Sequence, residues 1–180
     1  MKGLMLAIFL FLTFWGIAQE KTAQDFNLPD LNGKNYQLSN NYGKGPILIN
    51  FWATWCIPCR EEMKKLKQIY KTYEKDGLQI LSISIDDPKT VSKVKSFIKT
   101  NQYPFTVLLD TNNEVFQLYK GTNPPLSVLL DQQGKIVYEH TGYRKGDEKL
   151  LEQEIIALIG KSDKTGAKAQ SDELGEKDEE

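Results

Sequence analysis

Residues 47–62 read ILINFWATWCIPCREE, in which an apolar run leads through a short step into the only two cysteines of the chain, Cys56 and Cys59. The run at 47–52 predicts a strand buried on both faces, which belongs at the centre of a sheet. A helix that begins directly after it would place Cys56 at the helix N-terminus. Unpaired backbone N–H groups and the helix dipole stabilise a thiolate there, and the thiolate is the reactive form of cysteine.

The chain on both sides of this stretch alternates between strand and helix patterns. Asn32-Gly33 between the alternating segments 25–31 and 34–38 is a strong hairpin signal. Further strands are expected at 78–85, 105–109, 126–130 and 135–139, and helices at 57–76, 88–100, 114–119 and 147–159, with Gly77 and Gly160 ending the first and the last of these helices. The alternation predicts an α/β domain in three layers, α/β/α, whose sheet has a largely parallel centre and antiparallel hairpins at its edges.

Length and composition are those of one globular domain with extensions. The 180 residues include 23 basic and 24 acidic side chains and carry a formal charge of −1, which gives no general attraction to nucleic acid. We expect a single globular domain over residues 19–160. The segment 161–180 has four lysines, seven acids and Leu174 as its one large apolar residue, so we expect a disordered acidic tail.

The N-terminal segment has the pattern of a secretory signal peptide. Lys2 precedes an apolar run at 4–17, and Ala18 is followed by polar residues, which predicts a signal peptide over 1–18. The run is short against the roughly 20 residues of a membrane-spanning helix. We therefore expect an exported, periplasmic protein. Secretion and membrane anchoring are the alternatives, and contact with the membrane is expected only if the segment stays uncleaved.

Counting potential ligands narrows the roles of the Cys-X-X-Cys pair. A zinc site needs four ligands, and the chain adds only His140 to the two cysteines. Covalent haem attachment needs a histidine directly after Cys59, where this chain has Arg60. A purely structural disulfide stays open, although a bridge across two residues constrains the unfolded chain little. Thiol–disulfide exchange, with Cys56 attacking and Cys59 resolving, fits the spacing best and needs no metal or other cofactor.

The segment 51–62, FWATWCIPCREE, resembles the active-site signature of the thioredoxin superfamily, and its extended form is most similar to the exported TlpA/ResA-type thiol–disulfide oxidoreductases. Supporting matches occur at 25–34, DFNLPDLNGK, and at 129–137, LLDQQGKIV. The resemblance covers about 23–160 and implies a thioredoxin fold with an N-terminal β-hairpin. Residues 88–109 correspond to the helix-and-strand insert that separates this family from plain thioredoxin.

The same resemblance implies roles for individual residues. Cys56 matches the attacking cysteine and Cys59 the resolving one. Trp55 and Pro58 match the residues that adjoin the substrate, and Pro125 matches the cis-proline that faces the cysteines and pairs with a substrate strand.

Glu62 matches a buried glutamate implicated in proton transfer, although a structural role in the first helical turn is the alternative. Asn50 stands where plain thioredoxins have an aspartate, and an amide cannot accept the proton. Two residues depart from the family pattern: Lys64 replaces a helix proline, and Pro124 lacks the N–H that relatives can donate to a substrate. His140 is expected at the surface or at a sheet edge.

These features predict an enzyme that exchanges disulfides with oxidised protein substrates. The resemblance favours reduction, with electrons received from a membrane thiol reductant, as in cytochrome c maturation. Two alternatives belong to other classes: a dithiol module that binds Cu(I) without turnover, and a thiol peroxidase. Peroxiredoxins carry a threonine three residues before the reactive cysteine, where this chain has Ala53.

Overall fold

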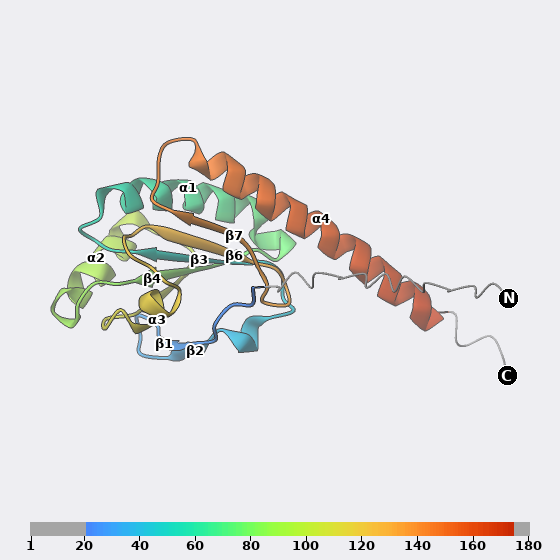
Figure 1. Ribbon diagram of the computed structural model, residues 1–180, viewed down its shortest axis with the longest axis horizontal. Coiled ribbons are helices and arrows are strands. Elements are labelled where there is room, and N and C mark those ends of the chain that lie inside the picture. The colour runs from blue at the N-terminus through green and yellow to red at the C-terminus, as the bar shows by residue number, and fades with distance from the viewer. Residues whose placement is uncertain (1–20, 175–180) are drawn as a thin grey trace, which may run out of the picture.

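The computed structural model describes the backbone of residues 21–174 and the side chains of residues 21–160 (Figure 1). The predicted signal peptide, residues 1–18, lies outside the described residues. Between residues 21 and 174, no helix is both long enough and apolar enough to span a membrane.

A five-stranded sheet forms the centre of the domain. β3 (Ile47–Trp52) is its middle strand and is buried at every position, as predicted. β3 pairs in parallel with β4 but antiparallel with β6, so the sheet is mixed and only one half of it is parallel. The strand order is β5-β4-β3-β6-β7, with β4 Gln79–Ser84, β5 Thr106–Leu109, β6 Leu126–Leu130 and β7 Ile136–Thr141.

Helices flank both faces of this sheet (Figure 1). Alternate residues of a strand point to opposite faces, so Trp52 packs on Phe97 with ring centroids 5.2 Å apart, while Phe51 packs on Phe116 of α3 at 5.4 Å. The helices are α1 Ile57–Tyr73, α2 Val91–Asn101, α3 Glu114–Leu118 and α4 Asp147–Leu174, with short 3₁₀ turns at Ser39–Asn41, Glu74–Asp76 and Pro88–Thr90. The predicted α/β thioredoxin-like architecture is confirmed.

The N-terminal hairpin forms as predicted, but its place in the fold differs from the prediction. β1 (Asn27–Pro29) pairs antiparallel with β2 (Asn35–Gln37) in a sheet of their own. A single bridge, Asp30 to Leu108, connects this hairpin to β5. Phe26 packs edge-on against the Tyr119 ring on the α3 side of the main sheet. The hairpin therefore covers a face of the main sheet instead of extending its edge, because its apolar side chains are buried there.

The last helix is longer than predicted. α4 continues through Gly160 to Leu174, so the expected helix end at residue 159 and the expected disorder of residues 161–174 are both wrong (Figure 1). Each of the two glycines in this part of the helix, Gly160 and Gly166, costs only about 1 kcal/mol relative to alanine, and no proline follows. Lysine, alanine, glutamine, glutamate and leucine favour helix and make up eight of the fourteen residues 161–174. Residues 175–180 lie outside the described residues.

Candidate active site

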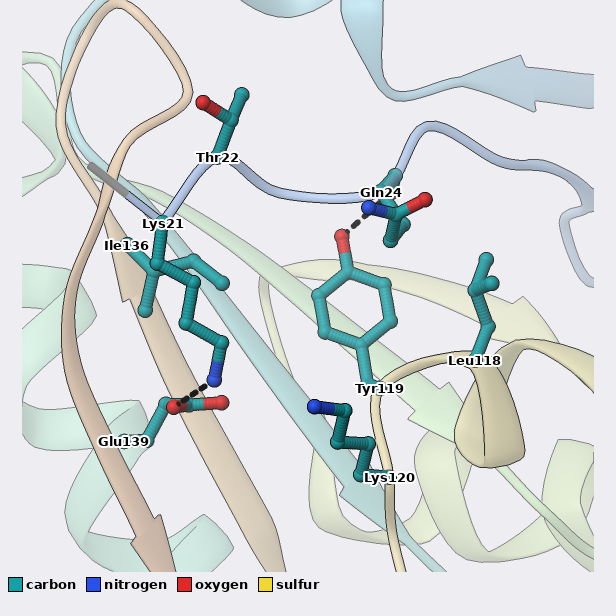
Figure 2. A pocket seen from close by; sticks show the side chains of 8 residues that line it. All are labelled: Lys21, Thr22, Gln24, Leu118, Tyr119, Lys120, Ile136 and Glu139. Atoms are coloured by element: carbon teal, nitrogen blue, oxygen red, sulfur yellow. Dashed lines mark hydrogen bonds and ion pairs between the residues drawn. The ribbon is translucent and has the colours of Figure 1, made fainter. Parts of the chain in front are cut away.

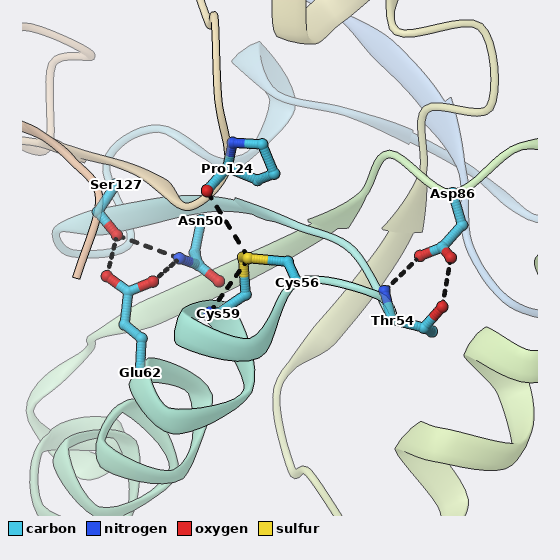
Figure 3. Close-up of a disulfide and its surroundings, with 8 residues drawn as sticks. All are labelled: Asn50, Thr54, Cys56, Cys59, Glu62, Asp86, Pro124 and Ser127. Atoms are coloured by element: carbon cyan, nitrogen blue, oxygen red, sulfur yellow. Dashed lines mark hydrogen bonds between the residues drawn. A yellow bond between two sulfur atoms is a disulfide. The ribbon is translucent and has the colours of Figure 1, made fainter. Parts of the chain in front are cut away.

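The two cysteines form a disulfide at the start of α1 (Figure 3). Cys56 is the N-cap residue of the helix, and the backbone N–H of Cys59 donates to its Sγ at 3.2 Å. Cys56 is 5% exposed, whereas Cys59 is fully buried. Because only the first sulfur borders solvent, a substrate can reach Cys56 and not Cys59. This difference supports the predicted roles of attacking and resolving cysteine.

Apolar side chains and a proline loop surround the accessible sulfur. Trp55 and Ile57 are 64% and 66% exposed, which is unusual for large apolar residues. The carbonyl oxygen of Pro124 lies 3.6 Å from Cys56 Sγ (Figure 3), and the Pro124–Pro125 peptide bond is cis. The structure thus brings Pro124 and Pro125 to the cysteines from a segment nearly seventy residues further along the chain.

Asp86 holds the loop that delivers Cys56. Its buried carboxylate accepts hydrogen bonds from the backbone N–H of Thr54 at 2.9 Å and from the Thr54 hydroxyl (Figure 3). It also accepts one from Ser84 Oγ at 2.9 Å. The next residue, Asp87, caps the following 3₁₀ turn, since its side chain accepts from the N–H of Lys89. Asp86 instead fixes the end of β3 to the end of β4.

Glu62 lies on the buried face of α1, one turn after Cys59. Its Oε2 accepts a hydrogen bond from Asn50 Nδ2 at 2.8 Å, and its Oε1 accepts one from Ser127 Oγ at 3.0 Å (Figure 3). Asn50 and Ser127 are directly opposite each other in the β3–β6 pairing, so both polar groups face the helix at the same level. All three side chains are buried.

This environment makes Glu62 a weak acid. Burial raises its pKa from 4.5 to about 7, against the opposing effect of the hydrogen bonds from Asn50 and Ser127, and the negative charge of Asp147 raises it further. Asn50 Oδ1 is buried without a hydrogen-bond partner among the described residues and points toward the disulfide (Figure 3). The carboxyl group can therefore gain or lose a proton near neutral pH.

His140 and Lys64, the other two residues singled out in the sequence, lie outside the hydrogen-bonded group around Glu62. His140 lies on the edge strand β7, as predicted, and its Nε2 is 3.1 Å from Asp147 Oδ2. Lys64 is exposed and pairs with Glu61 at 2.7 Å, and α1 continues as a helix through this position. A narrow gap of about 10 Å³ separates Glu62 from the His140–Asp147 pair.

A separate cavity of about 310 Å³ lies away from the cysteines (Figure 2). Lys21 and Glu139 form an ion pair across it, and the Tyr119 hydroxyl donates to the backbone oxygen of Gln24 at 2.7 Å. None of the predicted site residues lines this cavity.

The sequence of residues 20–139 matches the family described as AhpC/TSA. The chain belongs to this family. Curated relatives include the thiol-disulfide oxidoreductase ResA of Geobacillus thermodenitrificans, which is 36% identical over 127 residues, or 70% of this chain and 71% of the relative. ResA of Bacillus subtilis is 35% identical over 126 residues, or 70% of this chain and 69% of the relative. The protein is thus a ResA-like thiol–disulfide oxidoreductase.

Solved structures support this assignment within the AhpC/TSA family. A protein of Chlorobium tepidum assigned as the thiol:disulfide interchange protein DsbE superposes with a TM-score of 0.70 at 32% identity, covering 78% of this chain and 96% of that chain. A thioredoxin-like protein of Porphyromonas gingivalis gives a TM-score of 0.67 at 30% identity, covering 78% and 94%.

Two residues that shape the site could not be found from their own sequence context. Ser127 lies 65 residues from Glu62 and looks like an ordinary strand residue, so its role depends on the β3–β6 register. Asp86 follows an apolar strand, and polar residues at the carboxyl ends of neighbouring parallel strands do meet. That pattern is the one signal that could have connected it with Thr54.

Proposed function

We propose that this protein is an exported reductase that transfers electrons from a membrane thiol reductant to disulfides of protein substrates, as in cytochrome c maturation. The single observation that carries the proposal is the arrangement of the disulfide: an accessible Cys56 at a helix N-terminus, a buried Cys59, and a buried carboxyl group one turn further on. The family relationship supports disulfide exchange as the reaction, and the Glu62 carboxyl group near the cysteines supports reduction of the substrate as its direction.

The first chemical step uses the helix N-terminus. In the reduced protein, the Cys56 thiolate attacks one sulfur of the substrate disulfide, which forms a mixed disulfide and expels the other substrate sulfur as a thiolate that takes a proton from water. The N–H of Cys59, which lies 3.2 Å from Cys56 Sγ, stabilises the attacking thiolate. Trp55 and Ile57 supply apolar surface for the substrate chain beside the reacting sulfurs.

The second step requires Cys59 to lose its proton in a buried site. The Glu62 carboxylate accepts that proton, and the Cys59 thiolate attacks Cys56 Sγ, which closes the protein disulfide and expels the second substrate sulfur as a thiolate that takes a proton from water. Residues three apart on a helix share a face, which places Glu62 on the Cys59 side of α1. Asn50 lies between Glu62 and the disulfide (Figure 3), and we assign it a positioning role because its amide cannot hold the proton.

The charge near the sulfurs supports the proposed direction of electron flow. Strong oxidants of this fold owe their high potential to a stabilised reduced form, in which a thiolate lies among favourable groups. Here the ionised form of Glu62 places a negative charge near the pair and works against a stable thiolate. This arrangement favours a reducing dithiol over an oxidising disulfide.

The reduction potential of the Cys56–Cys59 couple tests the proposed direction. Equilibration with defined thiol–disulfide buffers, followed by mass spectrometry of the alkylated protein, measures it. We expect a value near that of thioredoxin, about −270 mV. A value near that of the strong oxidant DsbA, about −120 mV, would reverse the assigned direction.

Export is the second part of the proposal and rests on the sequence of residues 1–18. N-terminal sequencing of the mature protein from a bacterial host is expected to begin at Gln19. A mature protein that begins at Met1 and stays in the soluble cytoplasmic fraction would refute export.

A further inference from the structure

We infer that the substrate of this site is a protein segment that carries acidic residues a few positions from its reactive cysteine, and that a lysine-lined pocket beside the disulfide binds those residues. The inference rests on the proposed disulfide exchange and specifies its substrate. Disulfide exchange does not itself require acidic residues in the substrate, so the exchange and the preference for acidic substrates can be tested separately.

The pocket adjoins the Cys-X-X-Cys motif directly. It has a volume of about 510 Å³, and Pro58, which lies between the two cysteines in sequence, forms one of its walls. The exposed Trp55 and Ile57 belong to the same end of α1. The complete lining is Pro58, Glu61, Lys64, Lys65, Gln68, Tyr143 and Lys145.

The opposite wall of the pocket is connected to the proline loop that faces Cys56. The backbone N–H of Gly142 donates to the carbonyl oxygen of Pro125 at 2.7 Å, which fixes the segment 142–146 beside the cis-proline. The Tyr143 hydroxyl donates to Glu148 Oε2 at 2.8 Å and holds this segment to the start of α4. A substrate strand that lies alongside Cys56 and the Pro124–Pro125 segment therefore continues toward the pocket.

The charges that line the pocket fit an anionic occupant. Three lysines and one glutamate line it, a net charge of 3 − 1 = +2. Glu61 is already paired with Lys64 at 2.7 Å. Lys65 and Lys145 form no hydrogen bond or ion pair with residues 21–160, the part of the chain with described side chains. These two ammonium groups are available to carboxylates of a partner.

The acids nearest to these lysines are occupied by other groups. Glu148 accepts hydrogen bonds from the Tyr143 hydroxyl and from the N–H of Gly146, both at 2.8 Å. Asp147 accepts from the N–H of Arg144 at 2.8 Å and lies 3.1 Å from His140. Arg144 itself is exposed and adds a further positive charge to the same loop. The charge of Lys65 acts on Glu61 and Glu148, but neither acid forms an ion pair with it, so the lining of the pocket keeps its net positive charge.

The helical spacing sets the expected register of the substrate. Lys65 follows Cys56 by nine residues, which along a helix corresponds to roughly 13 Å. An extended peptide advances about 3.3 Å per residue. The acidic residues of the substrate are therefore expected about four residues from its cysteine.

Lys64, which lines this pocket, is also one of the two residues at which the chain departs from the family pattern. By resemblance, a proline is usual at that position, and a lysine there adds a cation to the lining and an N–H to the helix. The change that leaves α1 uninterrupted thus also contributes to the basic character of the pocket.

Competing peptides test the inference on the reduced full-length protein. Each short peptide carries one cysteine activated as the neutral 2-pyridyl disulfide, with a pair of glutamates, glutamines or lysines about four residues before or after it. Cys56 attacks the peptide sulfur, the bond to the pyridyl sulfur breaks, and the released pyridine-2-thione gives the rate. The glutamate peptide of one register is expected to react roughly two- to tenfold faster than its glutamine counterpart, an advantage that declines with added salt.

The variants K65Q/K145Q and K71Q/K75Q carry the same change in charge. The first pair removes the pocket lysines and is expected to reduce the glutamate-to-glutamine rate ratio to near one, while the second pair, at the far end of the helix, retains the ratio. Equal rates for all peptides with the wild type, or a ratio that survives in K65Q/K145Q, would overturn the inference. If no peptide of any charge reacts, the proposed exchange function fails, and the inference fails with it.

Discussion

Replacement of Glu62 by glutamine removes an ionisable group from the centre of the site while nearly preserving its shape. In the wild type, Oε1 and Oε2 of Glu62 accept hydrogen bonds from Ser127 and Asn50. In Glu62→Gln, the new amide can keep the bond from Ser127. The Asn50 side chain can rotate so that its unpaired Oδ1 accepts from that amide. The main consequence is therefore electrostatic.

The magnitude follows from the pKa of this carboxyl group, which burial raises from 4.5 to about 7. Below pH 4.5 the group binds a proton in both the folded and the unfolded state. As pH rises toward 7 the unfolded state loses that proton first, so the stabilisation present at low pH is lost as pH passes through the folded-state pKa. The difference between the two pKa values corresponds to about 3 kcal/mol in the free energy of unfolding.

Urea denaturation of the oxidised protein at pH values from about 4.5 to 8, followed by tryptophan fluorescence, measures this effect. The free energy of unfolding of the wild type minus that of Glu62→Gln is expected to fall by about 3 kcal/mol across this range. Glu61→Gln is the matched control, since Glu61 is exposed, and it is expected to leave no such pH-dependent difference. A difference that stays flat for Glu62→Gln would refute the perturbed pKa, and with it the proton-transfer role.

Three further predictions concern the cysteines, the loop that delivers them, and the core. Cys59→Ser is expected to accumulate a mixed disulfide with a protein substrate on non-reducing gels, whereas Cys56→Ser forms none; an adduct with the second variant alone would exchange the two roles. Asp86→Ala leaves the Thr54 N–H unpaired and is expected to cost about 1–3 kcal/mol in urea denaturation, more than Asp87→Ala; equal losses would contradict the assigned clamp. Ile155→Ala is expected to lower the free energy of unfolding by about 2–5 kcal/mol, because the Ile155 side chain is fully buried. Ile156→Ala is expected to lower it much less, because the Ile156 side chain is 48% exposed. Similar losses for both variants would contradict the assigned contact of α4 with the core.

The centre of the fold could be predicted because its sequence has one physical interpretation. A strand that is apolar on both faces must be covered on both faces, and β3 does lie in the middle of the sheet. The burial of Glu62 near the cysteines is implied by the family resemblance, and the structure places this side chain on the buried face of α1. An element can thus be predicted where the apolar pattern of its own residues is enough to determine which of its faces are buried.

Features that depend on distant residues could not be predicted in the same way. The partners of Glu62 come from two different strands, and the register between those strands is not a local property. The hairpin covers a face instead of an edge because Phe26 meets Tyr119, a contact between residues 93 positions apart. Gly160 predicts too early an end for α4, because the cost of a glycine is small when good helix formers follow it.

Reduction of insulin disulfides tests the central claim most directly, with a chemical reductant recycling the protein and turbidity reporting the released chains. The wild type is expected to accelerate the reduction well above the rate of the reductant alone, and Cys56→Ser is expected to show no acceleration. Equal rates with wild type, with Cys56→Ser and without protein would contradict thiol–disulfide exchange through Cys56.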